Sequence, residues 1–143
     1  MTQLPHLQKD PENECDWFGA LAAMTRYLRS PQGCPWDQKQ TATSFAEHAK
    51  GELDEYLEAI GSGNRPHIEE EFGDTLFVLL ASAAAAEAEF GFNLARALEA
   101  AHEKMVRRHE HVFGENRAAT PEDAMRSWNE IKAAEKRAKG IGE

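Results

Sequence analysis

The chain has few of the residues that build sheets or disulfide frameworks. Its 143 residues include two cysteines without CxxC spacing, which are too few for a disulfide framework and fit a reducing compartment. It contains 3 valines, 4 isoleucines and 6 threonines against 23 alanines, so strong helix formers greatly outnumber the β-branched residues that favour sheets. These shortages predict an all-α fold, and the length of 143 residues predicts a single domain.

The chain also lacks a positive net charge and a long apolar run. Its 16 Lys and Arg residues against 25 Asp and Glu residues give a net charge of -9, which disfavours binding to nucleic acid or to an anionic membrane. The longest mostly apolar run, residues 76–86, is well short of the roughly 18 residues that span a bilayer. The polar N-terminus has no apolar signal-peptide core. We therefore expect a cytoplasmic protein without nucleic acid polymer or membrane partners.

Apolar residues at helical spacing predict five helices between two tails. We expect a flexible N-terminal tail at residues 1–13, a helical domain at residues 14–138 and a C-terminal tail at residues 139–143. Two prolines and one glycine predict an irregular loop at residues 31–43, since both residue types interrupt helices. The five helices are predicted at about residues 17–28, 44–60, 67–89, 94–108 and 121–131.

Several helix ends carry recognisable signals. Ser44 with Glu47 three residues later is typical of a capping box. Two glycines and a proline at residues 61–66 end that helix and return the chain antiparallel. Thr120 before Pro121 marks the start of the last helix. The third helix is apolar on nearly every side, which is typical of the central helix of a bundle.

Two acidic pairs are predicted to lie opposite each other across this antiparallel hairpin. Glu52 and Glu55, and likewise Glu71 and Asp74, are three residues apart and therefore adjacent on one helix face. Without a cation, two carboxylates about 6 Å apart repel by roughly 3 kcal/mol at an effective dielectric constant of 20. All-oxygen ligands suit Mg²⁺ or Mn²⁺ rather than Zn²⁺. Spacing alone leaves open that the pairs are solvated helix surface.

A basic block ends the fourth helix. Lys104, Arg107 and Arg108 lie at positions i, i+3 and i+4, where they can bind phosphate oxygens. Cations at a helix C-terminus are also stabilised by the macrodipole, so a structural role is equally open. Glu103 is either a fifth oxygen ligand or the partner of a neighbouring arginine.

Two residues of the predicted loop have alternative roles. Trp36 either stacks on a nucleic acid base or caps the core, and Asp37 is either a loop cap or a base contact. The ExxH pattern at Glu99 and His102 has no second copy, which disfavours a di-iron carboxylate bundle.

Five blocks in order resemble the MazG family of nucleoside triphosphate pyrophosphohydrolases over about residues 17–136: GCPWDQKQT, ELDEYLEAI, EEEFGDTLF, EKMVRRHEHVFG and SWNEIKAAEK. The resemblance implies an all-α bundle of four to five helices, of the MazG and dimeric dUTPase type. It also implies hydrolysis of NTPs or dNTPs to the monophosphate and pyrophosphate with Mg²⁺, or alternatively Mn²⁺, in nucleotide-pool house-cleaning. A homodimer or homotetramer is expected.

The family's metal motif, EExxE followed by ExxD, maps onto Gly51, Glu52 and Glu55, and onto Glu71 and Asp74. The resemblance implies that the four acidic residues hold the metal and that Glu55 orients or deprotonates the attacking water. Gly51 stands where the motif has its first Glu. The missing carboxylate leaves an alternative: a non-catalytic helical nucleotide-binding or assembly protein.

The basic block is similar to the family's KxxRRHPHVF, with Glu110 where proline is usual. The resemblance implies that its cations neutralise the charge that develops on the leaving pyrophosphate. The residues expected to bind the substrate are Trp36, Asp37, Lys104, Arg107 and Arg108.

Overall fold

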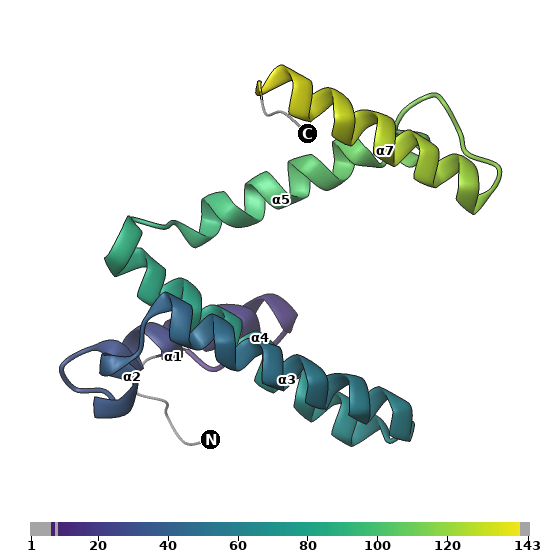
Figure 1. Cartoon of the computed structure of the whole chain (residues 1–143). Helices are drawn as coiled ribbons and strands as arrows, with labels where there is room; N and C mark the ends of the chain where they lie inside the picture. Colours follow the sequence, from purple (N-terminus) through teal and green to yellow (C-terminus); the bar gives the residue numbers. More distant parts are fainter. Residues whose placement is uncertain (1–6, 8, 141–143) are drawn as a thin grey trace. The chain divides into compact units, whose positions relative to one another are not determined.

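The computed structural model describes residue 7 and residues 9–140 (Figure 1). These residues contain helices and no strand, which confirms the predicted all-α fold. Parts of both predicted tails, residues 1–6, 8 and 141–143, lie outside the described residues. The helices are α1 (Glu14–Arg29), α2 (Pro35–Lys39), α3 (Ala42–Ser62), α4 (Arg65–Phe90), α5 (Leu94–Arg108), α6 (Glu110–Phe113) and α7 (Pro121–Ala138).

The chain divides into two compact units, which we describe separately. The N-terminal unit ends at Asn93 and contains α1 to α4, and the C-terminal unit begins at Leu94 and contains α5 to α7. Within the described residues, no single helix is both long and apolar enough to cross a membrane. Among these residues, only α4 and α5 taken together, with the bend between them, are long and apolar enough.

The antiparallel hairpin of α3 and α4 is the centre of the N-terminal unit, and α1 packs against α4 (Figure 1). The predicted turn is present. Gly63 ends α3 with a φ of 70°, in the left-handed region that glycine adopts without strain. Asn64 starts α4, because its side chain accepts a hydrogen bond from the His67 amide. At the other end of the hairpin, the Ala42 amide donates to Glu89 at 2.7 Å and the Ser82 hydroxyl donates to the Ala42 carbonyl at 2.8 Å.

The start of α3 differs from the prediction. Thr41 is the N-cap: its hydroxyl accepts from the Ser44 amide at 3.0 Å, and its own amide donates to the Ser44 hydroxyl at 2.9 Å. The predicted box of Ser44 and Glu47 is therefore wrong. Ser44 occupies the third helical position, where its hydroxyl accepts the hydrogen bond from the N-cap amide that a glutamate side chain usually accepts.

The segment predicted as an irregular loop contains the short helix α2, with Pro35 in its first turn. Proline suits this position because its fixed φ matches the helix and its missing N–H is not needed there. The Arg29 guanidinium at the end of α1 donates to the carbonyls of Asp37 at 2.8 Å and Gln40 at 2.9 Å. These hydrogen bonds satisfy carbonyls at the end of α2 and attach it to α1.

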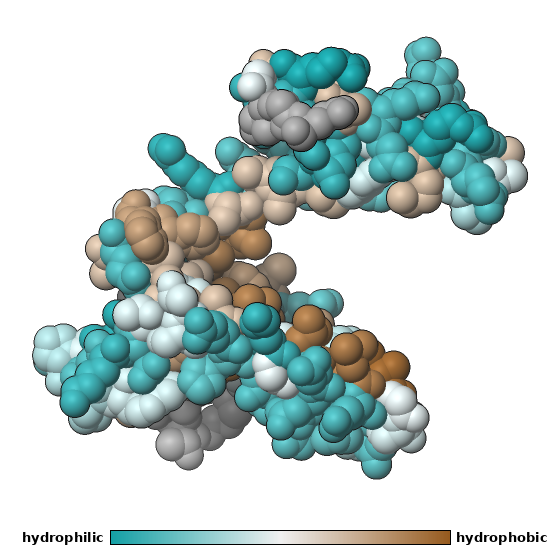
Figure 2. Space-filling view, in the orientation of Figure 1, coloured by the Kyte–Doolittle hydropathy of each residue, from teal (hydrophilic) through white to brown (hydrophobic). Residues whose placement is uncertain are grey.

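The N-terminal unit has a small core. Phe45 of α3 packs against Ala81 and Ala85 of α4, and no large side chain among the described residues is fully buried. Small residues at these positions let the two helices approach closely. Apolar side chains instead gather on the surface of the hairpin, where Figure 2 shows them in brown. The exposed large apolar residues of α3 and α4 are Leu53, Leu57, Ile60, Phe72, Leu79 and Phe90.

In the C-terminal unit, one carboxylate joins α5 to α7. Glu135 of α7 accepts hydrogen bonds from the guanidiniums of Arg107 and Arg108, the latter at 2.8 Å. Arg108 also lies over the Trp128 ring, 5.1 Å from its centroid, a favourable cation–π geometry. The hydrogen bonds from Arg107 and then Arg108 lower the pKa of Glu135 to about 2.

The pH dependence of stability tests the contact of Glu135 with Arg107 and Arg108, and the variant to compare is Glu135→Gln. Since the folded pKa lies below the ordinary value of 4.5, the ionised carboxylate stabilises the fold above about pH 4.5 and loses this effect as pH falls towards 2. We expect Glu135→Gln to melt at a lower temperature than the wild type near neutral pH, with a difference that shrinks in acid. Thermal melts followed by circular dichroism between pH 2 and pH 7 measure this difference in melting temperature, with Glu130→Gln as the control. A difference that does not depend on pH would contradict the ion pairs of Glu135 with the two arginines.

A carboxylate cluster on the hairpin

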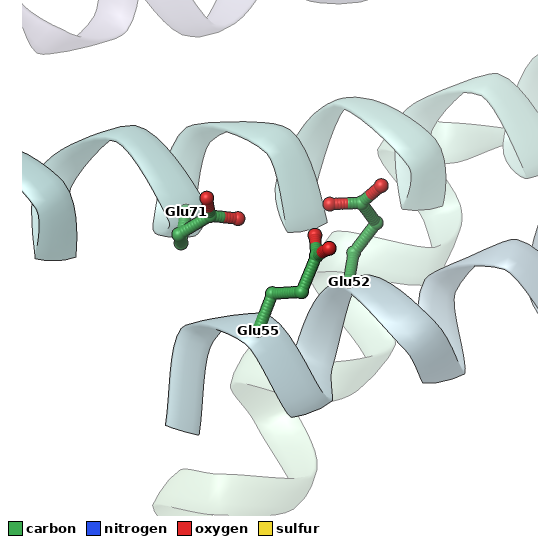
Figure 3. Close-up of side chains that lie close together, drawn as sticks. All are labelled: Glu52, Glu55 and Glu71. Atoms are coloured by element: carbon green, nitrogen blue, oxygen red, sulfur yellow. The ribbon is translucent and has the colours of Figure 1, made fainter. Parts of the chain in front are cut away.

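Three glutamates from the two hairpin helices point towards one another (Figure 3). Glu52 and Glu55 come from α3 and Glu71 comes from α4, and one carboxylate oxygen from each lies within 4.8 Å of the others. Asp74 forms a second group at the same spacing with Glu70 and Glu71. The structure therefore brings together the four acidic residues singled out from the sequence, with Glu71 common to both groups.

Burial distinguishes this cluster from solvated helix surface. Glu71 is only 8% exposed and Glu52 is half-buried. Each has a buried carboxylate oxygen, Oε2, without a hydrogen-bond partner among the described residues. Buried carboxylate oxygens without partners are destabilising, because they lose water and gain no compensating contact. A bound cation would supply that contact, so the residues present fit a metal ion.

The electrostatics of the cluster agree with this interpretation. Burial raises the pKa of Glu52, and so do its hydrogen bond with Glu55 and the charges of Glu55, Asp74 and Glu71. Burial also raises the pKa of Glu71, followed by the charges of Glu55 and Asp74. Ionised carboxylates at this site are therefore unfavourable by themselves, and an all-oxygen donor set suits a hard divalent cation.

Two residues beside the cluster were not found from the sequence. His67 of α4 lies with its Nδ1 atom 3.9 Å from Glu71 Oε1 and partly offsets the rise in the pKa of Glu71. Glu70 is exposed and belongs to the second carboxylate group. The i, i+4 spacing of His67 and Glu71 was the available signal.

A cavity of about 280 Å³ adjoins the cluster. Trp36 of α2 forms one side, with its ring centroid 5.9 Å from that of Phe45 and 5.7 Å from that of His48. Trp36 thus contacts the core residue Phe45 while remaining half exposed. Asp37 is buried and is not among the lining residues. The cavity is lined by Trp36, Phe45, His48, Glu52, Asp74, Phe77 and Val78.

The basic residues predicted to bind substrate lie in the C-terminal unit. Arg107 and Arg108 are engaged by Glu135 of α7. Lys104 is half-buried on α5, and Glu103 is exposed beside it.

Gly51 is not required by packing within the described chain. Beyond its chain neighbours and its own helix backbone, no atom lies within 4 Å of a Cβ built at this position. Position 51 is one turn before Glu55 and therefore on the same helix face. A carboxylate there would lie beside the cluster.

Comparisons with known proteins identify the family. Residues 40–113 match the family described as the MazG nucleotide pyrophosphohydrolase domain. The chain is 40% identical over 119 residues to YabN of Bacillus subtilis, covering 83% of this chain and 24% of that protein. It is 37% identical to the nucleoside triphosphate pyrophosphohydrolase/pyrophosphatase MazG of Thermotoga maritima, covering 83% of this chain and 45% of that protein.

A solved structure agrees. The crystal structure of a MazG-related protein from Thermotoga maritima matches with a TM-score of 0.67 and 32% identity, covering 79% of this chain and 96% of that one. The chain therefore belongs to the MazG family, which confirms the resemblance found in the sequence. The chain spans less than half the length of these two relatives: 24% of YabN and 45% of the Thermotoga maritima MazG protein.

Removing one buried charge should stabilise the metal-free protein. Because the pKa of Glu52 is raised, its ionised form destabilises the fold increasingly as pH rises above its ordinary value of 4.5. Near neutral pH without metal, we expect Glu52→Gln to melt at the same or a higher temperature than the wild type, and to gain less from added Mg²⁺. Glu58→Gln on the same helix is the control. A lower metal-free melting temperature with an undiminished Mg²⁺ effect would refute the assignment.

Two substitutions at Gly51 separate helix stability from metal binding. Gly51→Ala should stabilise by up to about 1 kcal/mol, since glycine is unfavourable in a helix interior and the position is open. Gly51→Glu should be less stable than Gly51→Ala without metal and should gain more from Mg²⁺, because the added carboxylate shares the face of Glu55. Melting curves across a Mg²⁺ titration compare them; equal Mg²⁺ responses would place position 51 outside the metal site.

Proposed function

We propose that this chain hydrolyses nucleoside triphosphates, NTPs or dNTPs, to the monophosphate and pyrophosphate as part of nucleotide-pool house-cleaning, with Mg²⁺ or alternatively Mn²⁺. The observation that carries the proposal is the carboxylate cluster with its two unpaired buried oxygens beside a cavity. Membership of the MazG family and the names of the relatives support the same reaction.

In this proposal, the carboxylates of the cluster bind the cation, and the exposed Glu55 also accepts a proton. Glu52 and Glu71, which carry the unpaired buried oxygens, hold the cation together with Asp74. Glu55 is exposed at the edge of the cluster, where it also binds the cation and accepts a proton from the attacking water. A bound divalent cation neutralises phosphate oxygens and lowers the pKa of a coordinated water.

The basic block of the C-terminal unit has its own proposed role. Lys104, Arg107 and Arg108 neutralise the charge that develops on the leaving pyrophosphate. Since Glu135 holds both arginines in the C-terminal unit, their guanidiniums are already oriented by a carboxylate, and binding a phosphate competes with that contact. Trp36 and Asp37 bind the nucleoside part, Trp36 from the cavity wall and Asp37 from a position that does not line the cavity.

The reaction is tested by its products. Wild-type protein should release pyrophosphate, not orthophosphate, from at least one nucleoside triphosphate in a panel of canonical and damaged NTPs and dNTPs, only when Mg²⁺ or Mn²⁺ is present. Glu55→Gln should lower turnover at least about a hundredfold while the fold persists, because it removes the proton acceptor. Glu58→Gln is the matched control. No product over the whole panel with both metals would favour a non-catalytic nucleotide-binding protein.

The proposed active form is a homodimer or homotetramer. The N-terminal unit buries few large side chains, while Leu57 on α3 is 59% exposed among other apolar residues. A unit this small gains little stability from a minimal core, and contiguous exposed apolar surface is typical of interfaces. We propose that a second copy of this chain covers the exposed apolar residues of α3 and α4 with its own, equally apolar hairpin.

Sedimentation measures the oligomeric state. We expect the wild type to sediment as a dimer or larger, and Leu57→Glu to shift it towards the monomer, because the substitution places a charge in the apolar surface. Ala46→Glu, which adds the same charge at an exposed position of the same helix, should leave the assembly intact. A fully active wild-type monomer would contradict the proposal.

A further inference from the structure

The cavity beside the carboxylate cluster has two chemically different ends. Glu52 and Asp74 line it and also belong to the carboxylate groups, so this end lies where the proposed cation and phosphates bind. The remaining lining side chains are Trp36, Phe45, His48, Phe77 and Val78. These are aromatic or apolar, as expected for the binding site of a flat, uncharged ring.

The volume and the ring arrangement suit a nucleobase. About 280 Å³ is too small for a whole nucleoside triphosphate and is adequate for its base and part of its sugar. Trp36 is held by contacts with Phe45 and His48 and is still 52% exposed. An aromatic side chain fixed in this way stacks on any base and does not by itself distinguish one base from another.

His48 is the lining residue that offers both a hydrogen-bond donor and an acceptor. Its uncharged imidazole offers one donor and one acceptor, whereas the Trp36 indole only donates and ionised Glu52 and Asp74 only accept. Among the described residues, no hydrogen bond is recorded for His48, whose ring contacts Trp36. His48 is also absent from the carboxylate groups that could hold a metal ion. Its hydrogen-bonding capacity is therefore available to a ligand.

We propose that the cavity holds the nucleobase of the substrate, and that the His48 imidazole hydrogen-bonds the edge of the base and so determines which bases are accepted. This inference rests on the proposed function. Trp36 provides the stacking surface and His48 provides the selection. A site that hydrogen-bonds its ligand rejects analogues with a mismatched edge, because the polar groups are then left unpaired.

Base selectivity is the direct readout. We would measure kcat/KM for the four common bases as dNTPs with wild type, His48→Ala and His48→Gln, and use inorganic tripolyphosphate as a base-free inhibitor. We expect the wild type to distinguish the bases and His48→Ala to reduce the ratio between the best and worst base by about tenfold. The inhibition constant of tripolyphosphate should be unchanged. His48→Gln, which keeps a donor and an acceptor, should alter the order of preference instead.

Glu47→Ala is the control, because Glu47 is an exposed neighbour of His48 that does not line the cavity. An equal fall for all four bases, an unchanged ratio in His48→Ala, or a wild type without preference would overturn the inference and leave the proposed hydrolysis standing.

Binding separates failure of the inference from failure of the proposed function. Calorimetric titration of wild type and His48→Ala with nucleoside monophosphates requires no turnover. Base-dependent binding that is lost in His48→Ala would support the inference even if no triphosphate were hydrolysed. Binding that is equal in both proteins, or absent from the wild type, would overturn it.

Discussion

Repulsion between carboxylates on α3 and α4 is the constraint on which the rest of this unit depends. The hairpin must hold Glu52, Glu55 and Glu71 within 4.8 Å of one another, although burial and neighbouring charges oppose the ionisation of Glu52 and Glu71. It does so from both ends. Gly63 and Asn64 form the turn at one end, and hydrogen bonds around Ala42 fasten the other. Alanines along α4 let the helices approach closely, so the acidic residues cannot simply move apart.

This arrangement links stability to the proposed chemistry. An α3–α4 interface filled by larger apolar side chains would be more stable and would separate the carboxylates. The observed interface has a small core and leaves Leu57 and other apolar residues exposed. The proposed ligands and partner would then contribute stability that the unit lacks alone, since whatever binds only the folded form stabilises it. The cation, the nucleotide and a second copy are therefore expected to stabilise the same hairpin.

The sequence predicted the features that depend on local spacing. The hairpin helices and the acidic pairs follow from helical periodicity, and the turn follows from the glycines and proline of residues 61–66; all are present. The cap at Thr41 was mispredicted because serine can occupy either side of a capping box. The helix α2 was missed because a single turn has too few residues to show periodicity. The place of His48 beside Trp36 depends on how α2 packs against α3, which no pattern within one helix encodes.

Gly51 shows how the cluster can tolerate a departure from the family motif. The glycine leaves α3 with two acidic residues at the cluster, while α4 carries Glu70, Glu71 and Asp74 within one helical turn. The unpaired buried oxygens lie on both helices, one on Glu52 and one on Glu71. A cation held by the hairpin would therefore have one buried carboxylate from each helix, with the exposed carboxylates around it. No packed atoms surround position 51. A glycine in place of the motif's glutamate therefore changes the charge of the site without changing the spacing of α3 and α4.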